Sequence, residues 1–150
     1  MSHSLTKILI HCIFSTEGRR ELLKGEISTR INAYMAGVAR NHGGHLIRAG
    51  GTADHRHLLL AIEPTTCVAD LVRFIKANSS KWLHETYPQV GRLGWQTGYA
   101  AFSVSESIRP RVVAYIDGQE EHHRRMTFEE ELRAILSRHG VSLDTADALE

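Results

Sequence analysis

The sequence predicts an α+β fold in which strands and helices follow the order β-α-β-β-α-β, with two additional C-terminal helices. Three observations predict it: four strand-like runs, two amphipathic helical stripes between them, and a Gly50-Gly51-Thr52 turn between the second and third runs. Four strands with two crossover helices on one face of the sheet form a ferredoxin-like sandwich. The other face should stay open unless something covers it.

The first strand is expected over residues 5–14, which are mostly apolar and include β-branched side chains. After a polar loop, apolar residues recur at helical spacing between Ile27 and Val38, which predicts an amphipathic helix. Gly43-Gly44 should end this helix, because glycine readily adopts the backbone conformation found just beyond helix ends.

The glycine turn should join a short strand over 45–48 to a longer strand over 54–63, so that the two form a hairpin. Thr65 or Thr66 can then cap a second amphipathic helix. We expect that helix to end somewhere within residues 82–87.

A fourth strand is expected over residues 99–104, after a loop that contains glycine and proline. Ser105 or Ser107 can cap a third helix, which continues past residue 115. A last helix should begin near Thr127 and run to about Arg138, with acidic residues in its first turn where they suit the helix dipole.

Length and composition predict a single domain over residues 1–150, with a flexible tail after about residue 140. Hydrophobic residues make up 42% of the chain and charged residues 23%, an ordinary globular balance that requires no disulfide at this length. No apolar run approaches the roughly 18 residues that span a bilayer, and the first residues lack the features of a signal peptide. We therefore expect no membrane partner and a cytoplasmic location.

The net charge of +1 argues against a protein that coats duplex DNA, since such proteins are usually strongly basic, but it allows a local basic groove. Arg109 and Arg111 lie at the start of the predicted third helix, and Arg124 and Arg125 lie beyond its middle. These four side chains are candidates for contact with phosphate groups. The simpler interpretation of each arginine alone is a solvated surface residue.

The segment Asp54-His55-Arg56-His57 begins the third predicted strand. Side chains two residues apart share one face of a strand, so His55 and His57 should point together toward the open face of the sheet. Two neutral imidazoles can hold a divalent cation if a third ligand is present. A pair of this kind alone is a weak signal, and the simpler interpretation is ordinary polar surface.

Tyr115 and Gln119 are four residues apart, which places both side chains on one face of the predicted third helix. A glutamine on a buried stripe requires a hydrogen-bond partner. A tyrosine on such a stripe is most often a packing residue. His122 and His123 follow close behind Gln119, and either could be a competing metal ligand.

The segment Asp54 to Leu59 resembles the histidine–hydrophobic–histidine (HUH) signature. The segment Val113 to His123 resembles the nucleophile helix of single-tyrosine HUH transposases, the TnpA-type enzymes of the insertion-sequence-200/605 group. Further segments that resemble this family, in the same order along roughly residues 5–140, are 11–16, 76–82 and 95–105.

The resemblance implies a role for each matching position. His55 and His57 would be two ligands of a divalent metal, Mg²⁺ or Mn²⁺, and Gln119 would be the third. Tyr115 would be the nucleophile. The family has a ferredoxin-like fold and acts as a homodimer on single-stranded DNA, often with hairpins at the element ends. In that family the tyrosine helix can complete the active site of the other subunit.

Arg56 departs from the family pattern, because the middle residue of the signature is usually hydrophobic. It should point away from the metal, toward the side of the sheet that packs against helices. A buried arginine without a partner is costly. We therefore expect Arg56 either to reach solvent at the edge of the strand or to pair with an acid such as Glu63 or Asp70.

The expected function is a metal-dependent DNA transposase that cleaves and rejoins single-stranded DNA through a 5′-phosphotyrosine intermediate. The covalent link conserves the energy of the phosphodiester bond, so strand transfer needs no ATP. One alternative is a non-catalytic protein that binds single-stranded or hairpin DNA on the same fold. Another is a replication- or mobilisation-type HUH nickase. The presence of His55, His57, Tyr115 and Gln119 together favours an enzyme, and the small size of the chain favours the transposase.

Overall fold

The computed structural model describes residues 4–91 and 94–142 of the chain. Four antiparallel strands form one sheet in the order β2-β3-β1-β4. In chain order the strands are β1 (Leu9–Ser15), β2 (Gly44–Gly50), β3 (His55–Ile62) and β4 (Ala100–Val104). This is the ferredoxin-like order that the sequence predicts.

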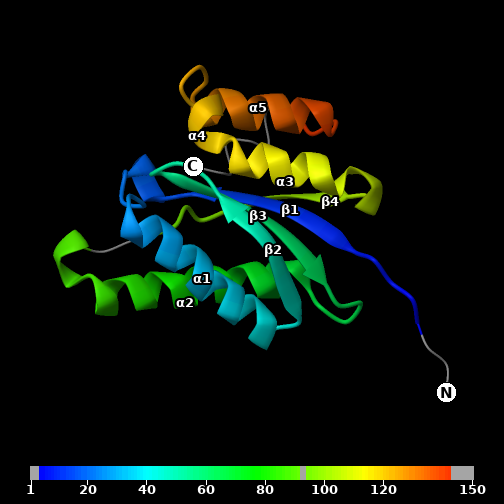
Figure 1. Ribbon diagram of the computed structural model, residues 1–150, viewed down its shortest axis with the longest axis horizontal. Helices are drawn as coiled ribbons and strands as arrows, with labels where there is room; N and C mark the ends of the chain where they lie inside the picture. The colour runs from blue at the N-terminus through cyan, green and yellow to red at the C-terminus, as the bar shows by residue number, and fades with distance from the viewer. Residues whose placement is uncertain (1–3, 92–93, 143–150) are drawn as a thin grey trace.

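Helices cover both faces of the sheet (Figure 1). The two crossover helices on one face are α1 (Glu26–Asn41) and α2 (Val68–Thr86). The helices on the other face are α3 (Arg109–Asp117), α4 (Gln119–His122) and α5 (Phe128–Arg138). Single turns of 3-10 helix lie in the connections, at η1 (Glu17–Arg19), η2 (Pro88–Val90) and η3 (Glu106–Ile108).

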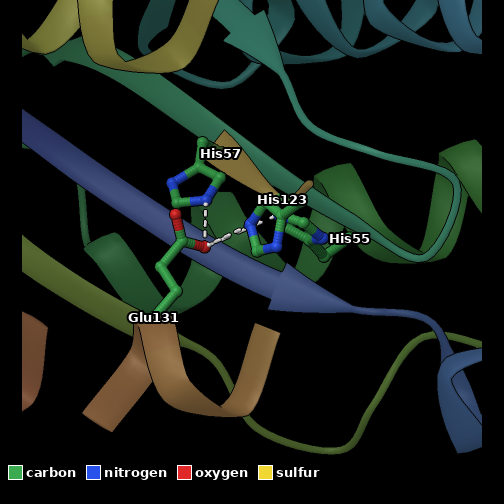
Figure 2. Close-up of side chains that lie close together, drawn as sticks. All are labelled: His55, His57, His123 and Glu131. Atoms are coloured by element: carbon green, nitrogen blue, oxygen red, sulfur yellow. Dashed lines mark hydrogen bonds and ion pairs between the residues drawn. The ribbon is translucent and has the colours of Figure 1, made fainter. Parts of the chain in front are cut away.

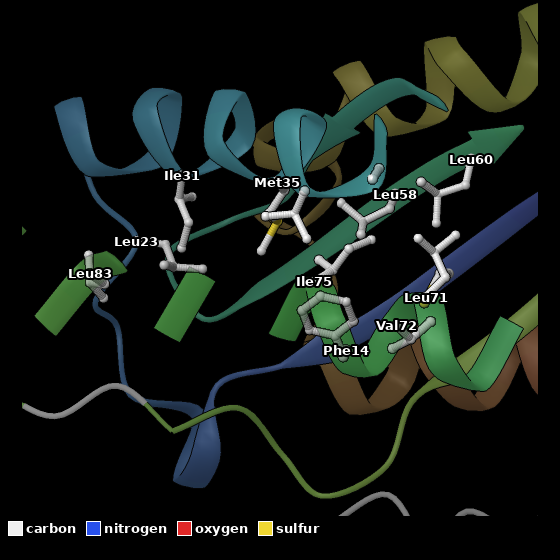
Figure 3. Packing of buried hydrophobic residues seen from close by; sticks show 13 residues of the cluster. Phe14, Leu23, Ile31, Met35, Leu58, Leu60, Leu71, Val72, Ile75 and Leu83 are labelled. Atoms are coloured by element: carbon white, nitrogen blue, oxygen red, sulfur yellow. The ribbon is translucent and has the colours of Figure 1, made fainter. Parts of the chain in front are cut away.

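The main hydrophobic core lies between the sheet and the crossover helices (Figure 3). Leu58 and Leu60 of β3 point into it, and they pack with fully buried side chains such as Phe14, Met35 and Ile75. Because side chains alternate along a strand, the odd-numbered residues of β3 must point toward α3, α4 and α5. The alternation of β3 therefore places His55 and His57 on the face opposite the main core.

The C-terminal helices differ in one respect from the sequence prediction. The expected third helix is interrupted at Gly118, which caps α3 by donating its N–H to the carbonyl oxygen of Ala114 at 3.0 Å. Gln119 then begins the separate helix α4. The break adds a helix to the two that were expected. Tyr115 and Gln119 still lie on the same side of the structure, because both side chains contact Glu131.

Local signals located the second crossover helix but not its cap. Cys67 precedes α2 and provides no side-chain cap. The hydroxyl group of Thr66 instead donates a hydrogen bond to the carbonyl oxygen of Gly43, at 2.8 Å. The threonine is used for a tertiary contact with the end of α1, which its neighbours in sequence could not reveal.

In the described ranges, no helix combines the length and the apolar character needed to cross a bilayer. The tail predicted after about residue 140 lies mostly outside the described residues, which end at Ser142. The single domain over residues 1–150 and the cytoplasmic location stay predictions.

Candidate metal and nucleophile site

His55 and His57 share one face of β3, as predicted, but that face is not open. Both side chains are 0% exposed, because residues of α4 and α5 contact them. Phe128 at the start of α5 contacts the ring of His55, with 4.6 Å between the ring centroids. The expectation that a ligand reaches the imidazoles across an open sheet face is therefore wrong. The two rings form the side of a buried polar cluster that faces the sheet.

In two imidazoles of the cluster, Nδ1 lies within hydrogen-bond distance of an oxygen acceptor. His55 Nδ1 lies 2.8 Å from the carboxylate of Asp54, and His123 Nδ1 lies 2.8 Å from the carbonyl oxygen of Met126. Each Nδ1–H is donated to that oxygen, so in the neutral ring the lone pair of Nε2 faces the centre of the cluster. Those Nε2 atoms lie 2.9 and 3.0 Å from Oε1 of Gln119.

The amide of Gln119 has a fixed orientation, because its Nε2 donates to Oε2 of Glu131 at 2.8 Å. Its Oε1 must then face the imidazoles of His55 and His123. Three lone pairs converge there, and neutral groups hold such an arrangement only if a proton or a cation lies between them.

The spacing of these atoms fits a divalent cation. Neighbouring ligand atoms around an octahedral Mg²⁺ are about 3 Å apart, since each lies about 2.1 Å from the ion. The distances from the two imidazole Nε2 atoms to the Gln119 oxygen match this spacing. The amide oxygen of Gln119 is a ligand type that also suits Mn²⁺. The structure thus brings His55 and His57 into one cluster with Gln119, and it adds His123, one of the competing ligands that the sequence allowed.

Glu131 lies at the centre of the cluster (Figure 2). This side chain is 1% exposed and projects from α5. Its Oε1 atom lies 3.0 Å from Nε2 of His57, 3.0 Å from Nε2 of His123 and 3.6 Å from Nε2 of His55. The ligand atoms of these four residues all lie within 4.8 Å of one another.

The sequence pattern places Glu131 only in the acidic first turn of the last helix and does not reveal this role. One signal was available. Phe128, Leu132, Ile135 and Leu136 form the apolar stripe of α5, and position 131 falls on the same stripe. A carboxylate on a buried stripe requires partners, in the same way as the glutamine of the third helix.

Tyr115 joins the cluster through Glu131, since its hydroxyl group donates a hydrogen bond to Oε2 of that carboxylate. Its ring also contacts the ring of His57, with 5.6 Å between centroids. Burial and the hydrogen bond to Glu131 raise the pKa of Tyr115 above its usual value of about 10. The phenol is therefore neutral near pH 7.

The pKa shifts of the other buried groups follow from their partners. Burial alone would raise the pKa of Glu131, but hydrogen bonds from His57, Tyr115 and Gln119 outweigh burial and hold it well below its usual range. Burial lowers the pKa of His57 and lowers that of His11 to about 3. These two rings are hydrogen-bonded to each other at 2.8 Å. The centre thus contains an ionised carboxylate, and both members of this histidine pair are neutral.

Arg56 is fully buried, so the expected contact with solvent is wrong. Its guanidinium donates to the carbonyl oxygens of Thr52 and His55, at 2.8 and 2.9 Å, and to the hydroxyl of Ser28 at 2.5 Å. Neither acid suggested by the sequence is a partner in these contacts. Burial lowers the pKa of Arg56 to about 10, so it remains charged near neutral pH. It stabilises the turn before β3 and the backbone of a proposed ligand.

The structure does not gather the four candidate DNA-binding arginines in one groove. Arg111 lines a cavity of about 550 Å³ beside Tyr115, and Arg124 lines a different cavity of about 510 Å³. Arg109 is 3.5 Å from the carboxylate of Glu106, which lies in the 3-10 turn η3 just before α3. Arg125 is exposed in the turn after α4.

Arg138 and His139 line the cavity beside Tyr115 together with Arg111. Neither residue is among the candidates that the sequence suggests. Two arginines, one from α3 and one from α5, therefore line the same cavity as Tyr115.

Comparison with known proteins gives a consistent result. The family model for IS200-like transposases matches residues 4–119. The ISDra2 transposase TnpA of Deinococcus radiodurans is 30% identical over 115 residues, which cover 73% of this chain and 81% of that protein. The transposase for insertion sequence element IS200 of Salmonella typhimurium is 24% identical over 129 residues, covering 83% of this chain and 84% of that protein.

Solved structures are also similar. A crystal structure of a candidate transposase from Deinococcus radiodurans R1 has a TM-score of 0.64 and 25% identity, and covers 79% of this chain and 95% of that chain. A REP-associated tyrosine transposase bound to a REP hairpin has a TM-score of 0.59 and 16% identity, over 82% of this chain and 74% of that chain. At 16% identity, the similarity to the second structure shows a shared fold.

Proposed function

We propose, because this chain belongs to the family of IS200-like transposases, that it cleaves and rejoins single-stranded DNA through a 5′-phosphotyrosine intermediate. The observation that supports this best is one buried cluster. Within it, Tyr115 is hydrogen-bonded to Glu131, and the donor atoms of His55, His57 and Gln119 converge beside them.

Tyr115 is the proposed nucleophile. Its phenolic oxygen attacks the phosphorus atom of the scissile phosphodiester, and the bond from phosphorus to the 3′-oxygen breaks. The phenolic proton has a defined acceptor in Oε2 of Glu131, which already receives the hydrogen bond. The leaving 3′-oxygen takes up a proton from solvent. The products are therefore a 5′-phosphotyrosine and a strand with a free 3′-hydroxyl, and attack by the 3′-hydroxyl of another strand reverses the step.

His55, His57 and Gln119 are the proposed ligands of a divalent cation. A bound Mg²⁺ or Mn²⁺ supplies Lewis acid chemistry that offsets the negative charge of the phosphodiester. The carboxylate of Asp54 holds the ring of His55 so that Nε2 faces inward, and His11 contacts the outer nitrogen of His57. These contacts orient two of the ligands before any substrate binds.

The DNA strand is proposed to pass through the cavity beside Tyr115, with Arg111 and Arg138 in contact with its phosphates. Arg109, Arg124 and Arg125 are proposed to contact more distant phosphates. One solved relative is bound to a hairpin, which supports hairpin ends as part of the substrate. We also propose a homodimer, on the basis of the family resemblance alone, and light scattering of the purified protein tests it.

Covalent capture tests the proposed function. The protein is incubated with hairpin-bearing single-stranded DNA and Mn²⁺, and the products are separated on a denaturing gel. A protein–DNA adduct that forms with Mn²⁺ and does not form when a chelator is present from the start is the expected result. Adduct-free binding would instead favour the non-catalytic DNA-binding alternative. A nickase of the replication or mobilisation type would form the same adduct, and membership in a transposase family favours the transposase.

A further inference from the structure

We propose that Glu131 is a direct ligand of the divalent cation, additional to the two histidines and the glutamine. This inference rests on the cation site of the proposed function and deepens it. Glu131 lies outside the residues matched by the family model, which end at Gln119. The site of this chain would thus include α5, a helix beyond the matched region.

Distances to the imidazoles support the assignment. Oε1 of Glu131 lies 3.0 Å from Nε2 of His57, and Nε2 of His55 is 3.6 Å away. The first value matches the separation of about 3 Å expected for neighbouring ligands of an octahedral Mg²⁺, and the second is longer than it by about 0.6 Å. No rearrangement of α5 is needed to bring the carboxylate to the centre of the cluster (Figure 2).

Charge provides a second argument. Neutral imidazoles and an amide oxygen leave the two positive charges of the ion uncompensated in a buried site. Glu131 is the one acidic side chain that is buried within residues 4–91 and 94–142. Hard divalent cations favour carboxylate oxygens, and a buried charge requires an opposite charge nearby. Glu131 provides a carboxylate oxygen and a negative charge at the centre of the cluster.

The two oxygens of Glu131 have different neighbours. Oε1 faces the imidazoles, whereas Oε2 accepts hydrogen bonds from Tyr115 and Gln119. Coordination through Oε1 therefore leaves the contact with the phenol in place. A single carboxylate can then fix the distance between the cation and the nucleophile.

Local structure holds α5 in the required position. Thr127 and Glu130 form a capping box at its start. The apolar side chains of α5 pack against Ile13, Ala100 and Phe102 of the sheet. Glu131 therefore projects from an anchored helix, which suits a ligand better than a mobile loop does.

Calorimetric titration with Mn²⁺ in the absence of DNA tests the proposal. Glu131→Gln keeps the size of the side chain and removes its charge. The matched control is Glu129→Gln, which removes an exposed carboxylate of the same helix that pairs with Arg19. We expect Glu131→Gln to weaken Mn²⁺ binding at least tenfold relative to this control. A smaller loss would overturn the proposal.

Diffraction from crystals of the unmodified protein soaked in Mn²⁺ gives a second measurement that does not depend on how the variant folds. The anomalous peak should lie within about 2.5 Å of a Glu131 oxygen. A peak within bonding distance of His55 and His57 but beyond about 2.5 Å from both Glu131 oxygens would overturn the assignment. That result would leave the proposed function intact. If the unmodified protein bound no Mn²⁺, the cation site itself would fail.

Discussion

The hydroxyl group of Tyr115 donates a hydrogen bond to the carboxylate of Glu131, although the two residues belong to different helices, α3 and α5. The same carboxylate contacts His57 of β3. Three elements that are distant in sequence are thereby joined through one side chain.

Replacement of Tyr115 by phenylalanine should abolish the covalent adduct, with a loss of at least about 1000-fold, because no other oxygen takes the place of the phenol. Binding of single-stranded DNA should change by less than about threefold, since the ring remains. Denaturing gels measure the adduct, and fluorescence anisotropy measures binding. An adduct of ordinary yield from Tyr115→Phe would show that another residue attacks.

Removal of the cation should stop cleavage. We expect EDTA to abolish cleavage and excess Mn²⁺ to restore it. His57→Ala removes an inward-facing nitrogen, so it should abolish cleavage in Mg²⁺. Mn²⁺ that binds the folded protein should raise the melting temperature of the unmodified protein, and His57→Ala should lack this rise. Thermal unfolding with and without Mn²⁺ measures the second effect. Cleavage at the original rate by His57→Ala would exclude this histidine as a ligand.

Stability without metal should fall as the pH drops below about 6.5. Burial lowers the pKa of His57 and lowers that of His11 to about 3, whereas both titrate near 6.5 in the unfolded chain. Between these values the unfolded state binds protons that the folded state does not, so acid favours unfolding. One such histidine is worth about 2 kcal/mol at pH 5.

Urea unfolding between pH 5 and 7 measures this effect, in a window where carboxylate titration contributes little. His11→Asn should have a shallower dependence of unfolding free energy on pH than the unmodified protein. Parallel curves for the two proteins would contradict the pKa shift assigned to His11.

Arg111 should contribute one phosphate contact. Arg111→Ala is expected to weaken the binding of single-stranded DNA and to lower the slope of log K against log salt by about 0.7, the value for one phosphate of a single strand. Arg73→Ala is the control, since Arg73 is an exposed residue of α2 that pairs with Asp70 on the other face of the sheet. Equal salt slopes for both variants would place the strand away from the cavity beside Tyr115.

Much of the fold was predictable because its signals are local. Alternation along β3 and the glycine turn before it were enough to place His55 and His57 on one face and to pair β2 with β3. The covering of that face was not predictable, because the rings contact α5 only after the chain has crossed the sheet. Glu131 is 74 residues from His57, its hydrogen-bond partner.

The break at Gly118 and the contacts of Arg56 were also missed, for a similar reason. Glycine in a helical pattern has a known cost, but that cost does not show whether the helix continues. The partners of Arg56 are two backbone oxygens and a serine hydroxyl. These groups are uncharged, so a search of the sequence for an acidic partner could not identify them.

Peptide mapping of the covalent adduct by mass spectrometry tests the central claim most directly. The chain contains four tyrosines, Tyr34, Tyr87, Tyr99 and Tyr115, so the modified residue can be identified without ambiguity. After nuclease trimming, the 5′-phosphonucleotide should be found on the peptide that contains Tyr115. A nucleotide attached to any other residue would contradict the assignment of the nucleophile.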